Sequence, residues 1–201
     1  MIRRIVVFML IGLLSLFVFG CTKKVVTRIN TEEVVDLSGR WNDTDSRLVS
    51  EEMILDALGR PWLTDFMTSR GKKPTVIVGA IKNLSAEHIA TGTFLGDIER
   101  EFVNSGKVEV VASREEREGV REEREDQQAN ASIESLKDFG REHGADFILI
   151  GQINAIEDEE KKEKIVFYQV DLTLTDIETN QKTWIGQKKI KKYIARARYT
   201  Y

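Results

Sequence analysis

The sequence contains a single cysteine, Cys21, and this limits how a chain of 201 residues can hold a fold together. One cysteine cannot form a disulfide bond within the chain, and it leaves no basis for a cysteine-rich zinc site. With only His88 and His143 present, a site built from several histidines is not expected either. The fold must therefore be stabilised by a hydrophobic core, for which 41% hydrophobic residues in a chain of this length suffice. We expect no metal and no cofactor.

The N-terminal residues have the three parts of a secretory signal. Arg3 and Arg4 form a positive start, residues 5–19 are nearly all apolar, and Gly20 precedes Cys21. Such a run is short for a bilayer-spanning helix, which takes about 20 residues. The junction resembles a lipobox, in which the cysteine thiol receives a diacylglyceryl group before the signal is removed. We therefore predict a signal peptide over residues 1–20 and a covalent lipid on Cys21; the alternative is an ordinary membrane anchor with an incidental cysteine.

The residues after the cysteine predict a location and a short tether. In Gram-negative lipoproteins, an aspartate directly after the lipidated cysteine commonly signals retention at the inner membrane, and here that position holds Thr22. By this resemblance we expect the outer membrane, with the protein facing the periplasm. Residues 21–36 contain no glycine or proline, and we interpret them as a tether of at most about 50 Å. Residues 37–201 are predicted to form a single globular domain.

The charge balance argues against nucleic acid as a partner. The chain has 30 Lys and Arg against 33 Asp and Glu, a net charge of -3. Such a balance offers no general attraction to nucleic acid or to an anionic membrane surface. We expect membrane contact only through the lipid.

Hydrophobic periodicity predicts helices and strands in mixed order, followed by a meander of strands. The clearest signal covers residues 165–175, where apolar residues from Val166 to Leu174 alternate with polar ones, so one face of this strand should see solvent. Among the helical positions, Leu48 and Val103 are expected to face inward. The predicted order is α+β: helices packed on one face of a four- to five-stranded mixed sheet. The predicted helices cover residues 45–58 (capped by Asp45 or Ser46), a short segment from Pro61, 94–103 and 132–143; the predicted strands cover 75–81, 107–112, 147–156, 165–175 and 182–191, with a charged turn over 158–164.

A charged repeat stands out in the middle of the chain. The pentapeptide REERE occupies residues 114–118 and is repeated seven residues later at 121–125. On a helix this spacing places Arg114, Arg117, Arg121 and Arg124 along one stripe. The stripe is either the solvated face of a protruding helix or a surface that presents guanidinium groups to an acidic partner.

The sequence carries no recognisable catalytic constellation. It has no nucleophile elbow, no phosphate-binding glycine loop and no metal-ligand pair at helical spacing. His88 lies next to Glu87 in a polar segment and could form half of an acid/base pair, but a surface histidine is the simpler interpretation. His143 before Gly144 suits a helix C-terminus. We therefore expect a protein that is not an enzyme and has no small-molecule substrate.

Six stretches of the sequence, taken together, form a recognisable pattern. They are VDLSGRWNDTD (35–45), RGKKPTVIVG (70–79), NSGKVEVVASREER (104–117), GADFILIG (144–151), FYQVDL (167–172) and WIGQKK (184–189). In this order they resemble the penicillin-binding protein activator lipoproteins of the LpoB type. The resemblance implies a fold similar to the N-terminal domain of TolB. It also implies a noncatalytic regulator that binds a docking domain of a class A penicillin-binding protein and stimulates peptidoglycan synthesis.

The tether departs from the family pattern. Well-known enterobacterial members carry a long proline-rich tether that crosses the periplasm, whereas residues 21–36 are few and contain no proline. An alternative function from another class is a structural or assembly lipoprotein of an envelope secretion or transport complex that uses the same module.

Overall fold

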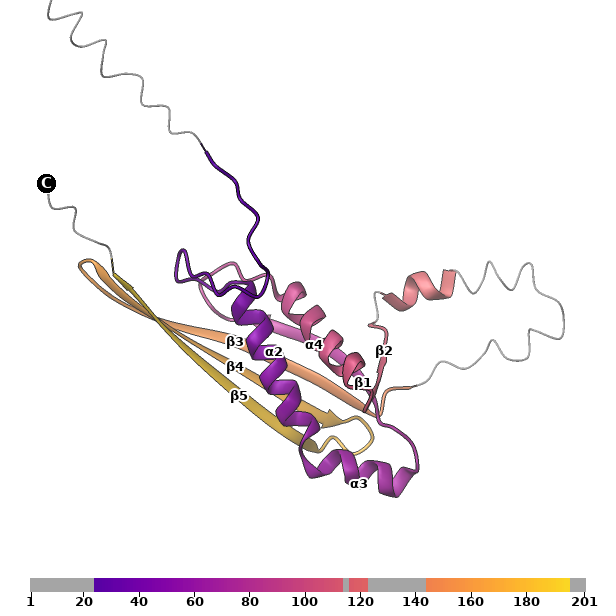
Figure 1. Ribbon diagram of the computed structural model, residues 1–201. Coiled ribbons are helices and arrows are strands. Elements are labelled where there is room, and N and C mark those ends of the chain that lie inside the picture. The colour runs from indigo at the N-terminus through magenta and orange to yellow at the C-terminus, as the bar shows by residue number, and fades with distance from the viewer. Residues whose placement is uncertain (1–23, 114–115, 123–143, 196–201) are drawn as a thin grey trace, which may run out of the picture. The chain divides into compact units, whose positions relative to one another are not determined.

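The computed structural model describes residues 24–113, 116–122 and 144–195 (Figure 1). Residues from Val34 onward form one compact unit, and the residues before it belong to a separate unit. In that N-terminal unit the Glu33 amide donates to the Asn30 carbonyl oxygen at 3.1 Å, which closes a turn. Within the described ranges, no helix combines the length and apolar character needed to cross a membrane. Cys21, the predicted signal peptide and the predicted helix over 132–143 lie outside the described residues.

A five-stranded mixed sheet forms the centre of the compact unit. Its order is β2-β1-β3-β4-β5, with β2 and β3 parallel to β1 and the last three strands antiparallel. This confirms the predicted α+β fold with a mixed sheet. The strands are β1 (Thr75–Asn83), β2 (Glu109–Val111), β3 (Phe147–Glu160), β4 (Glu163–Asp176) and β5 (Lys182–Ala195).

Two helices lie side by side on one face of the sheet (Figure 1). Helix α2 (Asp43–Leu58) contacts β5 and α4, and α4 (Thr91–Ser105) contacts β1 and β2. A short helix, α3 (Pro61–Arg70), follows α2 at the end of the sheet. The alternation predicted for β4 is confirmed, because every second residue from Val166 to Leu174 is buried beneath the helices. The largest fully buried side chains are Tyr168, Phe94, Phe102, Ile54, Ile98, Leu149, Ile153, Leu172, Leu174, Val49, Val76 and Val166.

Helix α2 begins earlier than the sequence predicted. Its N-cap is Asn42, whose side chain accepts from the Asp45 amide at 3.1 Å, while the Asp45 carboxylate accepts from the Asn42 amide at 3.0 Å. This reciprocal pair is a capping box, so Asp45 is the third helical residue and not the cap. Two side chains expected to face inward are exposed, Leu48 to 44% and Val103 to 57%.

The charged turn predicted over residues 158–164 is mostly strand. Strands β3 and β4 pair as far as Glu160 and Glu163, which leaves Lys161 and Lys162 to make the turn, with Lys161 at φ 57°. Opposite charges across the strands favour this pairing, since Lys164 forms an ion pair with Glu157 at 2.6 Å. The last strand is also longer than predicted and ends at Ala195 instead of residue 191.

Candidate binding groove between α2 and the edge strand β5

A groove in the described surface runs between α2 and β5. It has two adjoining parts, of about 700 Å³ and about 610 Å³, which share Glu52 and Leu55 in their walls. The first part lies at the C-terminal end of α2, and the second lies over its N-terminal half. Because β5 is the last strand of the sheet, the groove lies along a sheet edge.

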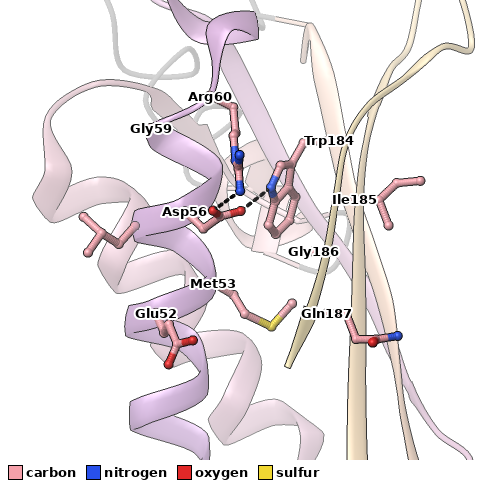
Figure 2. A pocket seen from close by; sticks show the side chains of 10 residues that line it. Glu52, Met53, Asp56, Gly59, Arg60, Trp184, Ile185, Gly186 and Gln187 are labelled. Atoms are coloured by element: carbon pink, nitrogen blue, oxygen red, sulfur yellow. Dashed lines mark hydrogen bonds and ion pairs between the residues drawn. The ribbon is translucent and has the colours of Figure 1, made fainter. Parts of the chain in front are cut away.

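A tryptophan joins α2 to β5 in the first part of the groove (Figure 2). The Trp184 indole Nε1 donates to Asp56 Oδ2 at 2.8 Å, and Arg60 forms an ion pair with the other oxygen of Asp56. Hydrogen bonds from Arg60 and then from Trp184 hold the pKa of Asp56 below its ordinary value. A Cβ added to Gly186 would lie 2.2 Å from the Trp184 ring, so glycine is required where the indole crosses the strand.

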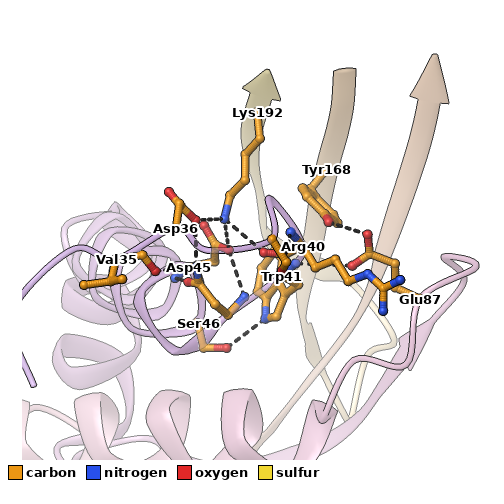
Figure 3. A network of polar contacts seen from close by, with 11 residues as sticks. Val35, Asp36, Arg40, Trp41, Asp45, Ser46, Glu87, Tyr168 and Lys192 are labelled. Atoms are coloured by element: carbon orange, nitrogen blue, oxygen red, sulfur yellow. Dashed lines mark hydrogen bonds and ion pairs between the residues drawn. The ribbon is translucent and has the colours of Figure 1, made fainter. Parts of the chain in front are cut away.

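A lysine joins three segments in the second part of the groove (Figure 3). Lys192 Nζ donates to Asp36 Oδ1 and to Asp45 Oδ2, both at 2.6 Å, and to the Arg40 carbonyl oxygen at 3.2 Å. The side chains of Lys192 and Asp45 are only 10% and 9% exposed. We call Lys192, Asp36, Asp45 and the Arg40 carbonyl the lysine clamp. It fixes residues 36–40, which enter the compact unit, against both walls of the groove.

The hydrogen bonds of the lysine clamp also shift the pKa values of Lys192 and Asp36. Burial by itself lowers the pKa of Lys192, but the hydrogen bonds to Asp36 and Asp45 outweigh burial and raise it. The hydrogen bond from Lys192 lowers the pKa of Asp36. Both effects favour the charged forms of Lys192 and Asp36.

Glu87 links strand β4 to the segment that precedes α2. Its carboxylate accepts from the Tyr168 hydroxyl at 2.8 Å and from the Trp41 amide at 3.2 Å. Burial and the hydrogen bond to Glu87 raise the pKa of Tyr168. His88, which the sequence suggested as half of an acid/base pair, is exposed, and among the described residues no hydrogen bond or ion pair joins it to Glu87. In the part of the chain that the structure describes, no group of three His, Cys, Asp or Glu residues could hold a metal ion.

The two described arginines of the predicted stripe lie away from the groove. Arg117 and Arg121 are in a helical stretch over residues 116–122, which follows β2 at the opposite edge of the sheet from β5. Arg117 is half-buried, while Arg121 is exposed and engaged in an interaction. Arg114, Arg124 and the predicted lipidation site Cys21 lie outside the described residues. The structure therefore does not bring Arg117 or Arg121 together with the groove.

Sequence reasoning did not find the groove, although two signals for it are visible. Leu48 and Leu55 are seven residues apart in α2 and point away from the core, at 44% and 73% exposure. The last strand carries five lysines and no acidic residue. Neither signal identifies a groove until the helix is known to lie over the edge strand.

Comparisons with known proteins give a family match and a set of distant structural neighbours. The family model described as peptidoglycan-synthase activator LpoB matches residues 45–190. No curated protein matches the chain. Among solved structures, the LpoB C-terminal domain from Salmonella enterica is 14% identical, with 65% of this chain and 93% of that chain covered and a TM-score of 0.34. The NMR structure of E. coli LpoB is 12% identical, with 90% and 85% covered and a TM-score of 0.42.

Lipoproteins from other bacteria are similar at the same level. Lipoprotein GNA1162 from Neisseria meningitidis is 14% identical, with 63% of this chain and 88% of that chain covered and a TM-score of 0.38. All these TM-scores are below 0.5.

Proposed function

The chain belongs to the peptidoglycan-synthase activator LpoB family, and from this premise we propose that it is a lipid-anchored, noncatalytic activator of a class A penicillin-binding protein. The observation that carries the proposal is the extent of the family match. Residues 45–190 run from α2 to β5 and so include most of both walls of the groove. The family match thus supports a role for most of the folded unit, including the groove.

Activation by binding accounts for the chemistry of the groove better than catalysis does. Several titratable side chains of the groove are held in structural contacts: Asp56 by Arg60 and Trp184, and Lys192 by Asp36 and Asp45. Groups held in this way are not available as acid and base for a substrate. An activator needs only to bind the active state of the synthase more tightly than the inactive state.

The proposed placement follows from the predicted lipid on Cys21. The acyl chains would hold the protein at the outer membrane, since two or more chains give stable anchoring. The tether that follows has no proline and spans at most about 50 Å. We propose that the synthase, rather than the tether, covers the remaining distance across the periplasm.

The proposal is tested first by capturing the anchored protein from cross-linked cells and identifying its partners by mass spectrometry. We expect a class A penicillin-binding protein to be enriched, and the purified lipoprotein to accelerate glycan polymerisation by that synthase. Cys21→Ala should remove the protein from the membrane fraction and leave the purified chain able to stimulate the synthase. Recovery of secretion or transport subunits with no synthase would support the assembly lipoprotein instead.

A further inference from the structure

Strand β5 ends the sheet without a partner on its outer side. It pairs with β4 over almost its whole length, from Lys182 to Ala195, and no strand in the described ranges pairs with its other edge. The outer backbone N–H and C=O groups of this fourteen-residue strand have no backbone partner among the described residues, although residues 36–40 pack near its C-terminal end. Natural proteins rarely leave so long an edge unprotected, so what protects or fills it is informative.

Helix α2 provides one wall for an additional strand. Leu48, Glu51, Glu52 and Leu55 follow helical spacing and line the groove beside β5, and both leucines are exposed. A strand laid along the outer edge of β5 would turn every second side chain toward this wall. The groove is hence of the right kind to receive apolar side chains from a sixth strand.

The charge of β5 decides which kind of strand fits. The strand carries five lysines and no acidic residue, in a chain of net charge -3. Lys188 and Lys192 face α2 and form ion pairs with acidic residues there. Lys189 and Lys191 are exposed, and neither forms an ion pair with a described residue, although the charge of Lys189 helps to lower the pKa of Asp171 and Lys191 also lines the second part of the groove. Like charges directly opposite each other destabilise a strand pair, so the lysines oppose pairing with a second copy of β5.

We propose that β5 accepts an extended acidic segment of the partner protein as a sixth strand, with its apolar side chains in the groove under α2. This inference rests on the proposed function, and it specifies how the synthase is recognised. Backbone hydrogen bonds to β5 supply affinity, as in other complexes formed by strand addition. Specificity comes from alternation, with apolar side chains against Leu48 and Leu55 and carboxylates against Lys189 and Lys191.

The test uses the full mature lipoprotein in detergent and two kinds of probe. The first probe is the periplasmic part of the class A synthase recovered by capture. The second is a pair of synthetic peptides of about eight residues, one alternating Val with Glu and one alternating Val with Lys. The variant Lys189→Glu with Lys191→Glu is compared with Lys73→Glu with Lys107→Glu. The control pair makes the same charge change at exposed positions next to β1 and β2.

We expect the variant at β5 to bind the synthase at least about tenfold more weakly and the control pair to bind as the wild type does. The Glu peptide should bind the wild type and the Lys peptide should not, with the preference reversed in the β5 variant. Hydrogen exchange should show new protection at alternate amides of β5 on binding. Circular dichroism is the check that both variants are folded.

The outcomes separate the mode of recognition from the function. Synthase binding with no effect of the β5 variant and no protection of β5 overturns the sixth strand and keeps the proposed function. Peptide binding at β5 without any synthase binding keeps the sixth strand and overturns the proposed partner. If neither probe binds, or if β5 pairs with a second copy, the inference is wrong.

Discussion

The two edges of the sheet differ in length, in charge and in what lies above them. Strand β2 forms one edge with three residues, Glu109–Val111, so it offers few unpaired backbone groups. Strand β5 forms the other edge with fourteen residues, five lysines and an overlying helix. The short β2 edge offers little backbone for any added strand to pair with, whereas the lysines of the β5 edge disfavour only added strands that are positively charged. The β5 edge can therefore select its partner by charge, and the β2 edge cannot.

The β5 edge is also tied to the rest of the molecule at two points. Near its start, Trp184 connects it to Asp56 of α2, and near its end Lys192 connects it to Asp36 and Asp45. A strand that receives a partner strand must itself be held in a fixed position, and the contacts of Trp184 and Lys192 hold β5 against α2. Breaking either of them should damage the β5 edge and leave the β2 edge intact.

The largest expected effect comes from removing the charge of the lysine clamp. Lys192→Met keeps the apolar stem but leaves Asp45, only 9% exposed, without its cation. We expect a loss of about 3 kcal/mol in the free energy of unfolding, because one partner of a buried ion pair is left alone. Urea unfolding measures it. Lys107→Met beside the β2 edge is the control and should change stability by less than about 0.5 kcal/mol.

One glycine in β5 and one in α4 give the next contrast in stability. Gly186→Ala would place a Cβ 2.2 Å from the Trp184 ring and should cost about 2 kcal/mol through overpacking. Gly96→Ala in α4 meets no atom within 4 Å and should stabilise the protein by about 0.5–1 kcal/mol. Thermal unfolding monitored by circular dichroism compares the two. Equal melting temperatures would mean that the indole moves aside without cost.

The sequence predicted the features that depend on neighbouring residues better than those that depend on distant contacts. Alternation from Val166 to Leu174 predicted the two faces of β4, because burial on one side leaves a period of two in the sequence. The Asn42 capping box was missed, and the turn predicted over residues 158–164 was too long, because cross-strand pairing reaches Glu160 and Glu163. The groove was missed because it depends on contacts between distant residues: Asp36 and Lys192 are 156 residues apart in the chain. Local patterns give elements, but they do not show which elements meet.

An exposed leucine tests the groove without disturbing the core. Leu55→Ser changes a side chain that is 73% exposed, so stability should stay within about 0.5 kcal/mol of the wild type. If a partner buries this leucine, affinity for the synthase should fall about tenfold, which corresponds to about 1.4 kcal/mol. Val103→Ser on α4 is the matched control, since Val103 is 57% exposed away from β5. Calorimetric titration measures the affinity of both variants for the synthase. An equal loss of affinity in the two variants would point to a binding site other than the groove.

Acid provides a smaller effect that is specific to the clamp. The pKa of Asp36 is lowered from its ordinary value of 3.8 by the hydrogen bond from Lys192. Its contribution to stability is therefore complete above pH 3.8 and is lost as the pH falls toward the lowered pKa of the folded state. The wild type should lose more stability than Lys192→Met over this acidic range. Urea unfolding at several pH values below about 4 measures the difference, and parallel curves would remove Asp36 from the clamp.

The arginines beyond the β2 edge should matter least for binding. Arg117 is half-buried and Arg121 already makes an interaction, so neither offers the open charge that Lys189 and Lys191 offer on β5. We expect Arg117→Glu with Arg121→Glu to weaken synthase binding by no more than about threefold, mainly through long-range charge, which salt screens. The measurement is a titration at low and at physiological salt, with circular dichroism to verify the fold. Loss of binding in this variant, together with full binding by Lys189→Glu with Lys191→Glu, would invert the comparison. The docking surface would then lie beyond the short edge, and the lysines of β5 would serve only to keep the long edge from pairing with itself.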